Sequence, residues 1–174
     1  MDHYEKYGRS FFSRYDYEEV SSEGAGKLVD ALNVHISEGT LIGQEFKAAT
    51  GETFKVSETS NFDYTDPIDH SVSKNQGQIV RFSDGSRVVF RLSGTGSQGA
   101  TVRLYVEKYT KDSSQYKLET AKGLEGLIEV ALKISKLKEF LDREKPTVIT
   151  VSISLFPLSW CMMLMTTTVT ACAK

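Results

Sequence analysis

The sequence predicts an α+β fold in which helices pack on one face of an antiparallel sheet. Three observations indicate this fold class. Apolar residues recur at helical spacing in two stretches that bracket the middle of the chain, segments between them alternate with period two, and the dipeptide Asp84-Gly85 marks a tight hairpin. With 174 residues, 40% of them hydrophobic and 25% charged, the chain is long enough to bury one core.

The first predicted helix covers residues 21–36. Residues 1–20 before it combine aromatic and charged side chains without a clear period, so we expect a connecting segment there. Gly39 supplies a stop signal directly after the helix, whereas Gly24 and Gly26 weaken its first turn. The apolar stripe of this helix consists of Ala25, Leu28, Val29, Leu32 and Ile36.

Strands are predicted in the middle of the chain. The segment ETFKVSE (52–58) alternates and predicts a half-buried strand, and DPIDHSVSKNQG (66–77) predicts a turn-rich loop. The segments QIVRFS (78–83) and SRVVFRLS (86–93) predict a hairpin, with a positive φ at both Asp84 and Gly85. In the second arm the side chains of Val88, Phe90 and Leu92 share one face, and Val89 and Arg91 point to the other.

A further strand and a second helix follow. In TVRLYVEKY (101–109) the apolar Val102, Leu104 and Val106 alternate with outward residues that include Arg103. Because the helices cover one face, Arg91 and Arg103 are expected on the other, on adjacent strands, with side chains that converge. A helix is predicted over residues 119–141, with an apolar stripe of Leu124, Leu127, Ile128, Ala131, Ile134 and Leu137.

Composition excludes several classes of protein. A net charge of −2 and a pI near 6.0 give no bulk attraction to nucleic acid or to a membrane surface. The three histidines are scattered, and Cys161 and Cys172 match no metal or disulfide framework, so we expect no metal or other cofactor in this chain.

The apolar run that starts at Val151 is too short for a membrane span, because it is about fifteen residues long and contains Pro157. The polar start MDHYE predicts no secretory leader, and we expect a cytoplasmic protein.

The glycine-rich stretch RLSGTGSQGATVR (91–103) is the candidate binding site. It satisfies G-x-G-x-x-G, but a dinucleotide site needs a helix directly afterwards, and here a strand pattern follows. A protein-kinase loop needs valine at the position of Thr101 and later HRD and DFG motifs, which the sequence lacks. Two interpretations stay open: a phosphate cradle of backbone N–H groups, hydroxyls and two arginines, or a flexible hairpin tip with solvated arginines.

The same stretch closely resembles the phosphate-binding loop of the C-terminal domain of the phosphoglucomutase family, within the alpha-D-phosphohexomutases. The similarity also takes in YGRSFFSRYDYEEV, FDYTDPIDHSVSKNQG and KPTVIT, and it runs from about Tyr4 to Thr150. It implies a TATA-box-binding-protein-like domain over residues 21–150. Residues 1–20 would be the linker from a preceding domain, with Tyr7, Arg9, Arg14 and Tyr15 in the hinge.

The resemblance also implies a function. Members of the family interconvert glucose 1-phosphate and glucose 6-phosphate, through glucose 1,6-bisphosphate, with a phosphoserine and a bound Mg²⁺. Their last domain grips the phosphate that is not transferred, and we expect a monomer that takes a hexose phosphate. By position, the phosphate ligands would be Arg91, Ser93, Gly94, Thr95, Gly96 and Arg103.

The sequence departs from the family pattern at three places. The TASHN-like serine motif, the DGDGDR-like metal loop and the GEES-like sugar loop are absent from these 174 residues, so we expect a fragment that binds substrate without isomerising it. The alternative is a non-catalytic sugar-phosphate-binding or structural protein. His70 stands where the family has glycine in DPVDGS. Residues 151–174 follow the point where the family domain ends, and we expect this apolar tail to lie outside the fold.

Overall fold

The computed structural model of the chain describes residues 2–96 and 99–152. Its helices and strands follow one another along the chain, with one 3₁₀ turn, Ser113–Gln115, before α3. They are α1 (Asp2–Tyr7), β1 (Arg9–Val20), α2 (Ser22–Glu38), β2 (Glu45–Lys47), β3 (Thr53–Thr65), β4 (Val72–Phe82), β5 (Arg87–Gly96), β6 (Gly99–Thr110), α3 (Thr120–Ser135), α4 (Leu137–Leu141) and β7 (Val148–Ser152).

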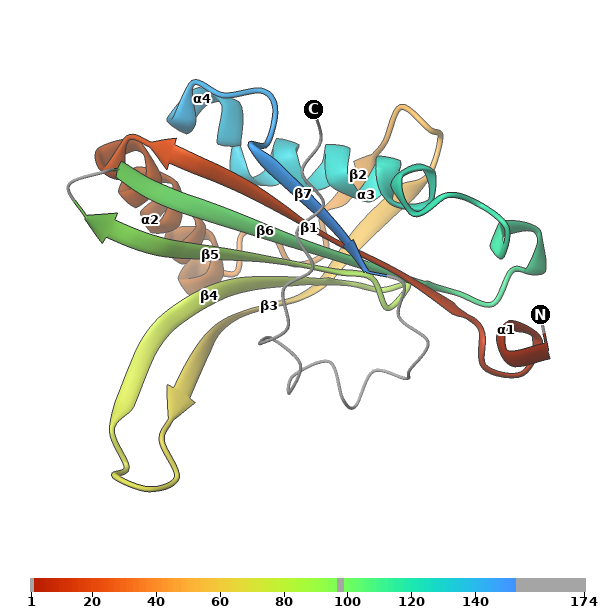
Figure 1. The fold of residues 1–174 in the computed structure, drawn as a ribbon, viewed down its shortest axis with the longest axis horizontal. Helices are drawn as coiled ribbons and strands as arrows, with labels where there is room; N and C mark the ends of the chain where they lie inside the picture. Colours follow the sequence, from red (N-terminus) through yellow and green to blue (C-terminus); the bar gives the residue numbers. More distant parts are fainter. Residues whose placement is uncertain (1, 97–98, 153–174) are drawn as a thin grey trace.

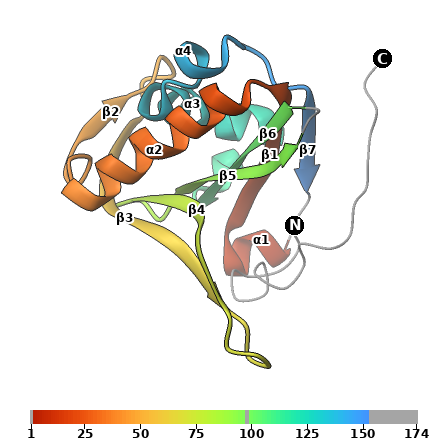
Figure 2. The same ribbon diagram turned by 90° about the vertical axis from the view of Figure 1, so that its left-hand side faces the viewer.

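The strands form one curled sheet in the order β2-β3-β4-β5-β6-β1-β7, and every paired neighbour is antiparallel. Helices α2, α3 and α4 lie on one face of this sheet (Figures 1 and 2). The core fills the space between the helices and the sheet, with Val88, Phe90, Leu104 and Leu127 fully buried. The predicted fold class is therefore confirmed. No helix within the described ranges is long and apolar enough to cross a membrane.

Strand β1 differs from the expected connecting segment. Residues 9–20 form an interior strand between β6 and β7 (Figure 1). The sequence of β1 shows no clear apolar alternation, because its inward positions include Ser13 and tyrosines rather than aliphatic residues. Asp16, on the outward face, is also buried. A register shift between Tyr17 and Val20 then ends the regular pairing. The sheet thus includes residues from before the expected domain start at residue 21.

Helix α2 confirms the first predicted helix. The hydroxyl of Ser21 accepts a hydrogen bond from the Gly24 N–H at 3.3 Å, and Gly39 ends the helix in the left-handed conformation with φ 64°. Gly24 also has a packing role, because a Cβ there would lie 2.2 Å from the carbonyl oxygen of Phe140 in α4. The glycine that weakens the first turn therefore lets α4 approach α2 closely.

The second predicted helix is broken. Lys136 adopts the left-handed conformation with φ 48°, which divides the segment into α3 and α4. Neither glycine nor proline marks this position in the sequence. The change of direction buries both Leu137 and Leu141 and brings α4 against α2. Burial of apolar side chains therefore overrides the local preference for one continuous helix.

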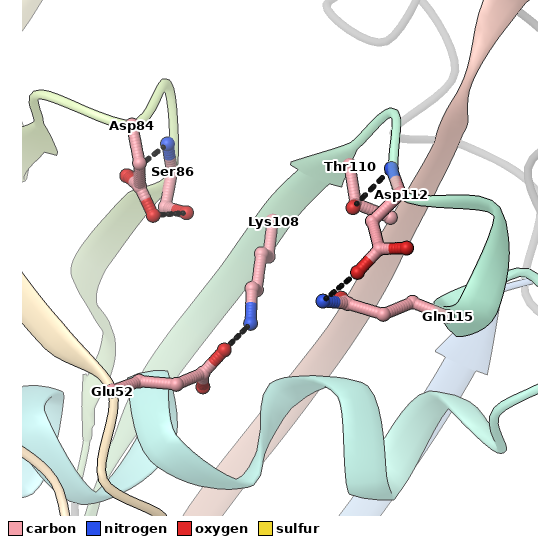
Figure 3. Close-up of polar contacts among 7 residues, drawn as sticks. All are labelled: Glu52, Asp84, Ser86, Lys108, Thr110, Asp112 and Gln115. Atoms are coloured by element: carbon pink, nitrogen blue, oxygen red, sulfur yellow. Dashed lines mark hydrogen bonds and ion pairs between the residues drawn. The ribbon is translucent and has the colours of Figure 1, made fainter.

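The β4–β5 hairpin forms where it was predicted, but with a different turn. The N–H of Phe82 donates to the Ser86 carbonyl at 2.9 Å, and the N–H of Gly85 donates to the Phe82 carbonyl at 3.1 Å. This is a three-residue loop in which Gly85 has φ 85° and Asp84 does not have a positive φ. The carboxylate of Asp84 accepts from the Ser86 N–H and hydroxyl at 2.9 and 2.8 Å (Figure 3).

Strands β3 and β4 extend into an arm that projects away from the helices (Figures 1 and 2). The expected loop over 66–77 is confined to residues 66–71, because Val72 already begins β4. Among the described elements no helix packs on the arm (Figures 1 and 2), so neither face needs an alternating apolar pattern. His70 keeps the turn with φ 58°, a conformation that suits glycine better, and its N–H donates to the Asp66 carbonyl at 3.0 Å.

One buried charge lies on the helix-covered side of the sheet. The ammonium group of Lys108 in β6 is paired with the carboxylate of Glu52, just before β3 (Figure 3). The same loop approaches α3 closely, since a Cβ on Gly126 would meet Thr50 and Glu52. A buried cation needs such a partner. The pair therefore ties the β2–β3 turn to the middle of the sheet.

The carboxyl end of the described chain adds a strand that was not predicted. Residues 148–152 form β7, which pairs with β1 at one edge of the sheet. The apolar tail expected from Val151 thus begins inside a strand. Residues 153–174, with both cysteines, lie outside the described residues.

The buried tyrosines of β1 predict a loss of stability at high pH. Burial, with a smaller effect of the neighbouring Tyr15, raises the pKa of Tyr17 to about 12, from 10.0. A raised folded-state pKa contributes stability that is complete below pH 10 and is lost as the pH rises toward 12. Tyr17→Phe is therefore expected to reduce the fall in unfolding free energy between pH 9 and 12, measured by urea denaturation.

Tyr64, exposed on the projecting arm, provides the matched control for that experiment. Tyr64→Phe should leave the pH dependence as it is in the unchanged chain. Equal pH dependence in Tyr17→Phe and the unchanged chain would contradict the assignment to Tyr17.

Candidate functional site

The candidate site lies on the face of the sheet opposite helices α2, α3 and α4 (Figures 1 and 2). Arg91 of β5 pairs directly with Arg103 of β6, and Ser93 pairs with Thr101. Directly paired residues of an antiparallel sheet share a face, with Cβ atoms about 4.5–5.5 Å apart. These four side chains therefore stand together on the open face. The intervening Leu92 and Val102 point into the core, as the sequence predicted.

Gly94 is the extra residue of a β-bulge. The register shifts by one between Ser93 and Thr95, and Gly94 is exposed with φ 66°. Pairing then resumes between Thr95 and Ala100 and continues to Gly96 and Gly99. The glycine-rich stretch is thus mainly strand, and its two central residues, 97–98, lie outside the described residues, as does the side chain of Thr95.

Strand β6 begins directly after this stretch, at Gly99, where a dinucleotide site would need a helix. Gly99 has φ 94°, and a Cβ there would lie 3.1 Å from the carbonyl oxygen of Val20 at the end of β1. Both its conformation and its close packing therefore require glycine. The strand that the sequence predicted on each side of the glycine-rich stretch is confirmed.

The side chains of Arg91 and Arg103 are directed toward different neighbouring strands. The Nε of Arg91 donates to the carbonyl of Gln76 in β4 at 3.0 Å, whereas the Nε of Arg103 lies 4.0 Å from Oδ1 of Asp16 in β1. The Cα atoms are paired as expected, but the side chains do not simply converge on the loop. Each guanidinium is directed from its Nε side by a different strand.

Asp16 is a member of the site that sequence reasoning missed. It is 3% exposed although it stands on the open face, because Arg14 and Arg103 flank it. Its Oδ1 lies 3.0 Å from Arg14 Nε, and an Nη of Arg14 donates to the Thr150 hydroxyl at 3.4 Å. The signal was present in the alternation of RYDY (14–17), where Arg14 and Asp16 occupy one face of a strand.

The expected hinge residues lie in different environments. Arg9 donates to the carbonyl oxygens of Tyr116 and Leu118, both at 2.7 Å, and so fixes the start of β1 to the loop before α3. Tyr15 is buried in the core, and Tyr7 is exposed. Of these residues, Arg14 is the one that the register places on the same face as the candidate site.

The arrangement favours an anion. Two arginines directly opposite each other repel, and a negative charge between them would offset that repulsion. Guanidinium groups, a serine hydroxyl and a threonine hydroxyl are donors that match a phosphate. No group of three or more His, Cys, Asp or Glu side chains in the described part of the chain is placed to hold a metal ion. The donors on this face could therefore serve an anionic ligand.

Similarity to known proteins covers most of this chain. The family model described as "Phosphoglucomutase-1, C-terminal domain" matches residues 9–147. The chain is 49% identical over 149 residues to phosphoglucomutase-1 of Bos taurus and of Homo sapiens, and the match covers 86% of this chain and 26% of each relative. The chloroplastic phosphoglucomutase of Solanum tuberosum is also 49% identical, over 86% of this chain and 23% of its own.

A solved structure has the same fold. It is the open form of the exocytosis-sensitive phosphoprotein pp63/parafusin, a phosphoglucomutase from Paramecium. The match has a TM-score of 0.67 and 42% identity, and it covers 84% of this chain and 24% of that one. The chain thus spans about a quarter of the length of the relatives that it matches.

The bulge predicts that residue 94 must be glycine for full stability. Alanine in a left-handed conformation costs roughly 1–2 kcal/mol, and a Cβ at Gly94 would meet no atom within 4 Å, so the cost is conformational. Gly94→Ala is therefore expected to lower the unfolding free energy by about 1 kcal/mol in urea denaturation. Gly26→Ala is the control, because Gly26 lies in α2 with equally open surroundings and an ordinary φ.

Gly26→Ala should stabilise the chain by about 0.5–1 kcal/mol, since alanine favours a helix. If Gly94→Ala were as stable as the unchanged chain, the left-handed bulge would not be a constraint on this stretch.

Proposed function

This chain belongs to the phosphoglucomutase family, in which it corresponds to the C-terminal domain, and we propose that its open sheet face binds the phosphate group of a hexose phosphate. The observation that carries the proposal is the direct pairing of Arg91 with Arg103 beside the bulge at Gly94. The proposed ligands are Arg91, Ser93, Gly94, Thr95, Gly96 and Arg103. Glucose 1-phosphate, glucose 6-phosphate and glucose 1,6-bisphosphate are the proposed substrates.

The proposed binding mode follows from the donors on this face. Each guanidinium offers a planar pair of N–H groups to phosphate oxygens, and such charge-assisted hydrogen bonds are short and strong. The Ser93 hydroxyl and the backbone N–H groups around the bulge add neutral donors. Local geometry supplies the attraction, since the whole chain has a net charge of −2. A phosphate dianion would relieve the repulsion between the arginines.

The proposed role in catalysis is positioning. Holding one phosphate of a sugar orients the rest of the molecule without taking part in bond making. We propose that phosphoryl transfer, and the Mg²⁺ that serves it in the family, belong to other parts of the longer relatives.

The same site would serve the alternative, a non-catalytic sugar-phosphate-binding protein. The two functions differ in what else the polypeptide carries and share the phosphate contacts. Relatives at similar identity include proteins named chloroplastic as well as the vertebrate ones. We propose the site for a cytoplasmic monomer and, because chloroplastic relatives match at similar identity, expect it to work equally in a plastid.

The arginine pair predicts a loss of affinity on substitution. Arg91→Ala and Arg103→Ala are each expected to weaken glucose 1-phosphate binding by roughly 10- to 150-fold, which corresponds to a charge-assisted contact of about 1.5–3 kcal/mol. Binding is measured by NMR titration of the 174-residue chain. The matched control is Arg87→Ala, since Arg87 lies on the same face of β5 but is paired with Glu107 at 2.7 Å.

Arg87→Ala should leave the affinity within about two-fold of the unchanged chain, because this arginine is outside the proposed cradle. Unchanged affinity in both Arg91→Ala and Arg103→Ala would contradict the proposed site.

The chain is also expected to bind without catalysing. The purified 174-residue polypeptide should show no conversion of glucose 1-phosphate to glucose 6-phosphate in a coupled dehydrogenase assay, with a phosphoglucomutase of full length as the positive control. Isomerisation that scales with the concentration of this polypeptide would contradict a purely binding role.

A further inference from the structure

We infer that Asp16 is the positioning residue of Arg103, and through it of the phosphate site. This inference rests on the proposed function and adds a residue from a third strand to it. Asp16 lies outside the glycine-rich stretch and far from it in the sequence, on β1. It would act without touching the phosphate, by holding the side chain that does.

The first support is the row of residues across the sheet. Arg103 is paired with Arg91 on one side and with Asp16 on the other, so the three side chains stand in line on the open face. A lone arginine pair in this position would be repulsive. Asp16 supplies the negative charge next to the pair when no phosphate is present.

The second support is the burial of the contact. The side chain of Asp16 is 5% exposed, and its Oδ1 lies between Arg14 Nε at 3.0 Å and Arg103 Nε at 4.0 Å. All three atoms are buried, and none makes a hydrogen bond within the described residues. A buried carboxylate with unused acceptor capacity strongly favours keeping its cationic neighbours close.

The third support is the lack of another anchor. Within the described ranges, Asp16 is the acidic residue within ion-pair distance of Arg103, whose Nε makes no hydrogen bond. Arg91 has its own anchor in the Gln76 carbonyl. If Asp16 attracts the Nε side of Arg103, the two terminal nitrogens remain directed outward, where a phosphate can accept from both.

Arg14 fixes the carboxylate in turn. It holds Asp16 Oδ1 at the shorter of the two distances and donates to the Thr150 hydroxyl on β7. The chain of contacts therefore runs from the edge of the sheet through β1 to the site on β6. Without the carboxylate, Arg103 would have to lose its side-chain freedom when phosphate binds, at a cost of about one immobilised long side chain.

A double-mutant cycle tests the inference with glucose 1-phosphate as the probe, titrated by NMR into the 174-residue chain. Asp16→Asn is expected to weaken binding by about 3- to 10-fold, the cost of ordering one side chain. In the Arg103→Ala background, Asp16→Asn should have no further effect. The Arg103 Nε–Hε resonance should also broaden or move toward the solvent-exposed position in Asp16→Asn.

The matched control is Glu107→Gln, which removes another buried carboxylate from the same face, where it is paired with Arg87. Glu107→Gln should leave the affinity within about two-fold of the unchanged chain. If Asp16→Asn does not fold, Asp16→Glu retains the charge and displaces the carboxylate by one methylene, and the same cycle is run with it.

Two results would overturn the inference while leaving the proposed function intact. One is equal or tighter binding in the Asp16 variant, which would make the carboxylate irrelevant or a competitor of phosphate. The other is a loss of the same size in the Arg103→Ala background, which would show that Asp16 acts through other groups. If the unchanged chain gives no shifts with glucose 1-phosphate, the proposed function itself fails, and this inference fails with it.

Discussion

The covering of one sheet face by helices is the constraint on which the rest of this structure depends. Helices α2 and α3 bury the inward residues of β1, β5 and β6, so alternation places every second residue of these strands on a face without helices (Figure 2). Charged side chains on that face must find their partners along the sheet itself. Arg87 with Glu107 and Arg14 with Asp16 are such pairs.

Strand register then decides which charges meet. A slip of one residue between β5 and β6 would send Arg91 or Arg103 into the core, and the buried Val102 and the partly buried Leu92 forbid it. The bulge at Gly94 comes after this pair and shifts the register beyond Ser93, where no large core side chain follows on β5. Regular pairing up to Ser93 and the left-handed Gly94 directly after it place the guanidinium and hydroxyl donors beside the bulge.

The sequence predicted local features well and tertiary ones less well. Helix α2, with its glycine stop, and the outward face of Arg91 follow from patterns within a few residues. Strand β1 was missed because its inward positions include serine and tyrosine, and the break at Lys136 has no local signal. Both features are fixed by what packs against them rather than by propensity.

By itself the sequence determined the alternation, the hairpin and the donor types in the glycine-rich stretch, because these depend on side-chain period and backbone freedom. The resemblance to the phosphoglucomutase family rests on the same residues. Only the tertiary structure brought Asp16 next to Arg103, since that contact requires β1 to pair with β6. Strand order is set by the burial of a shared core, and no short stretch of sequence specifies it.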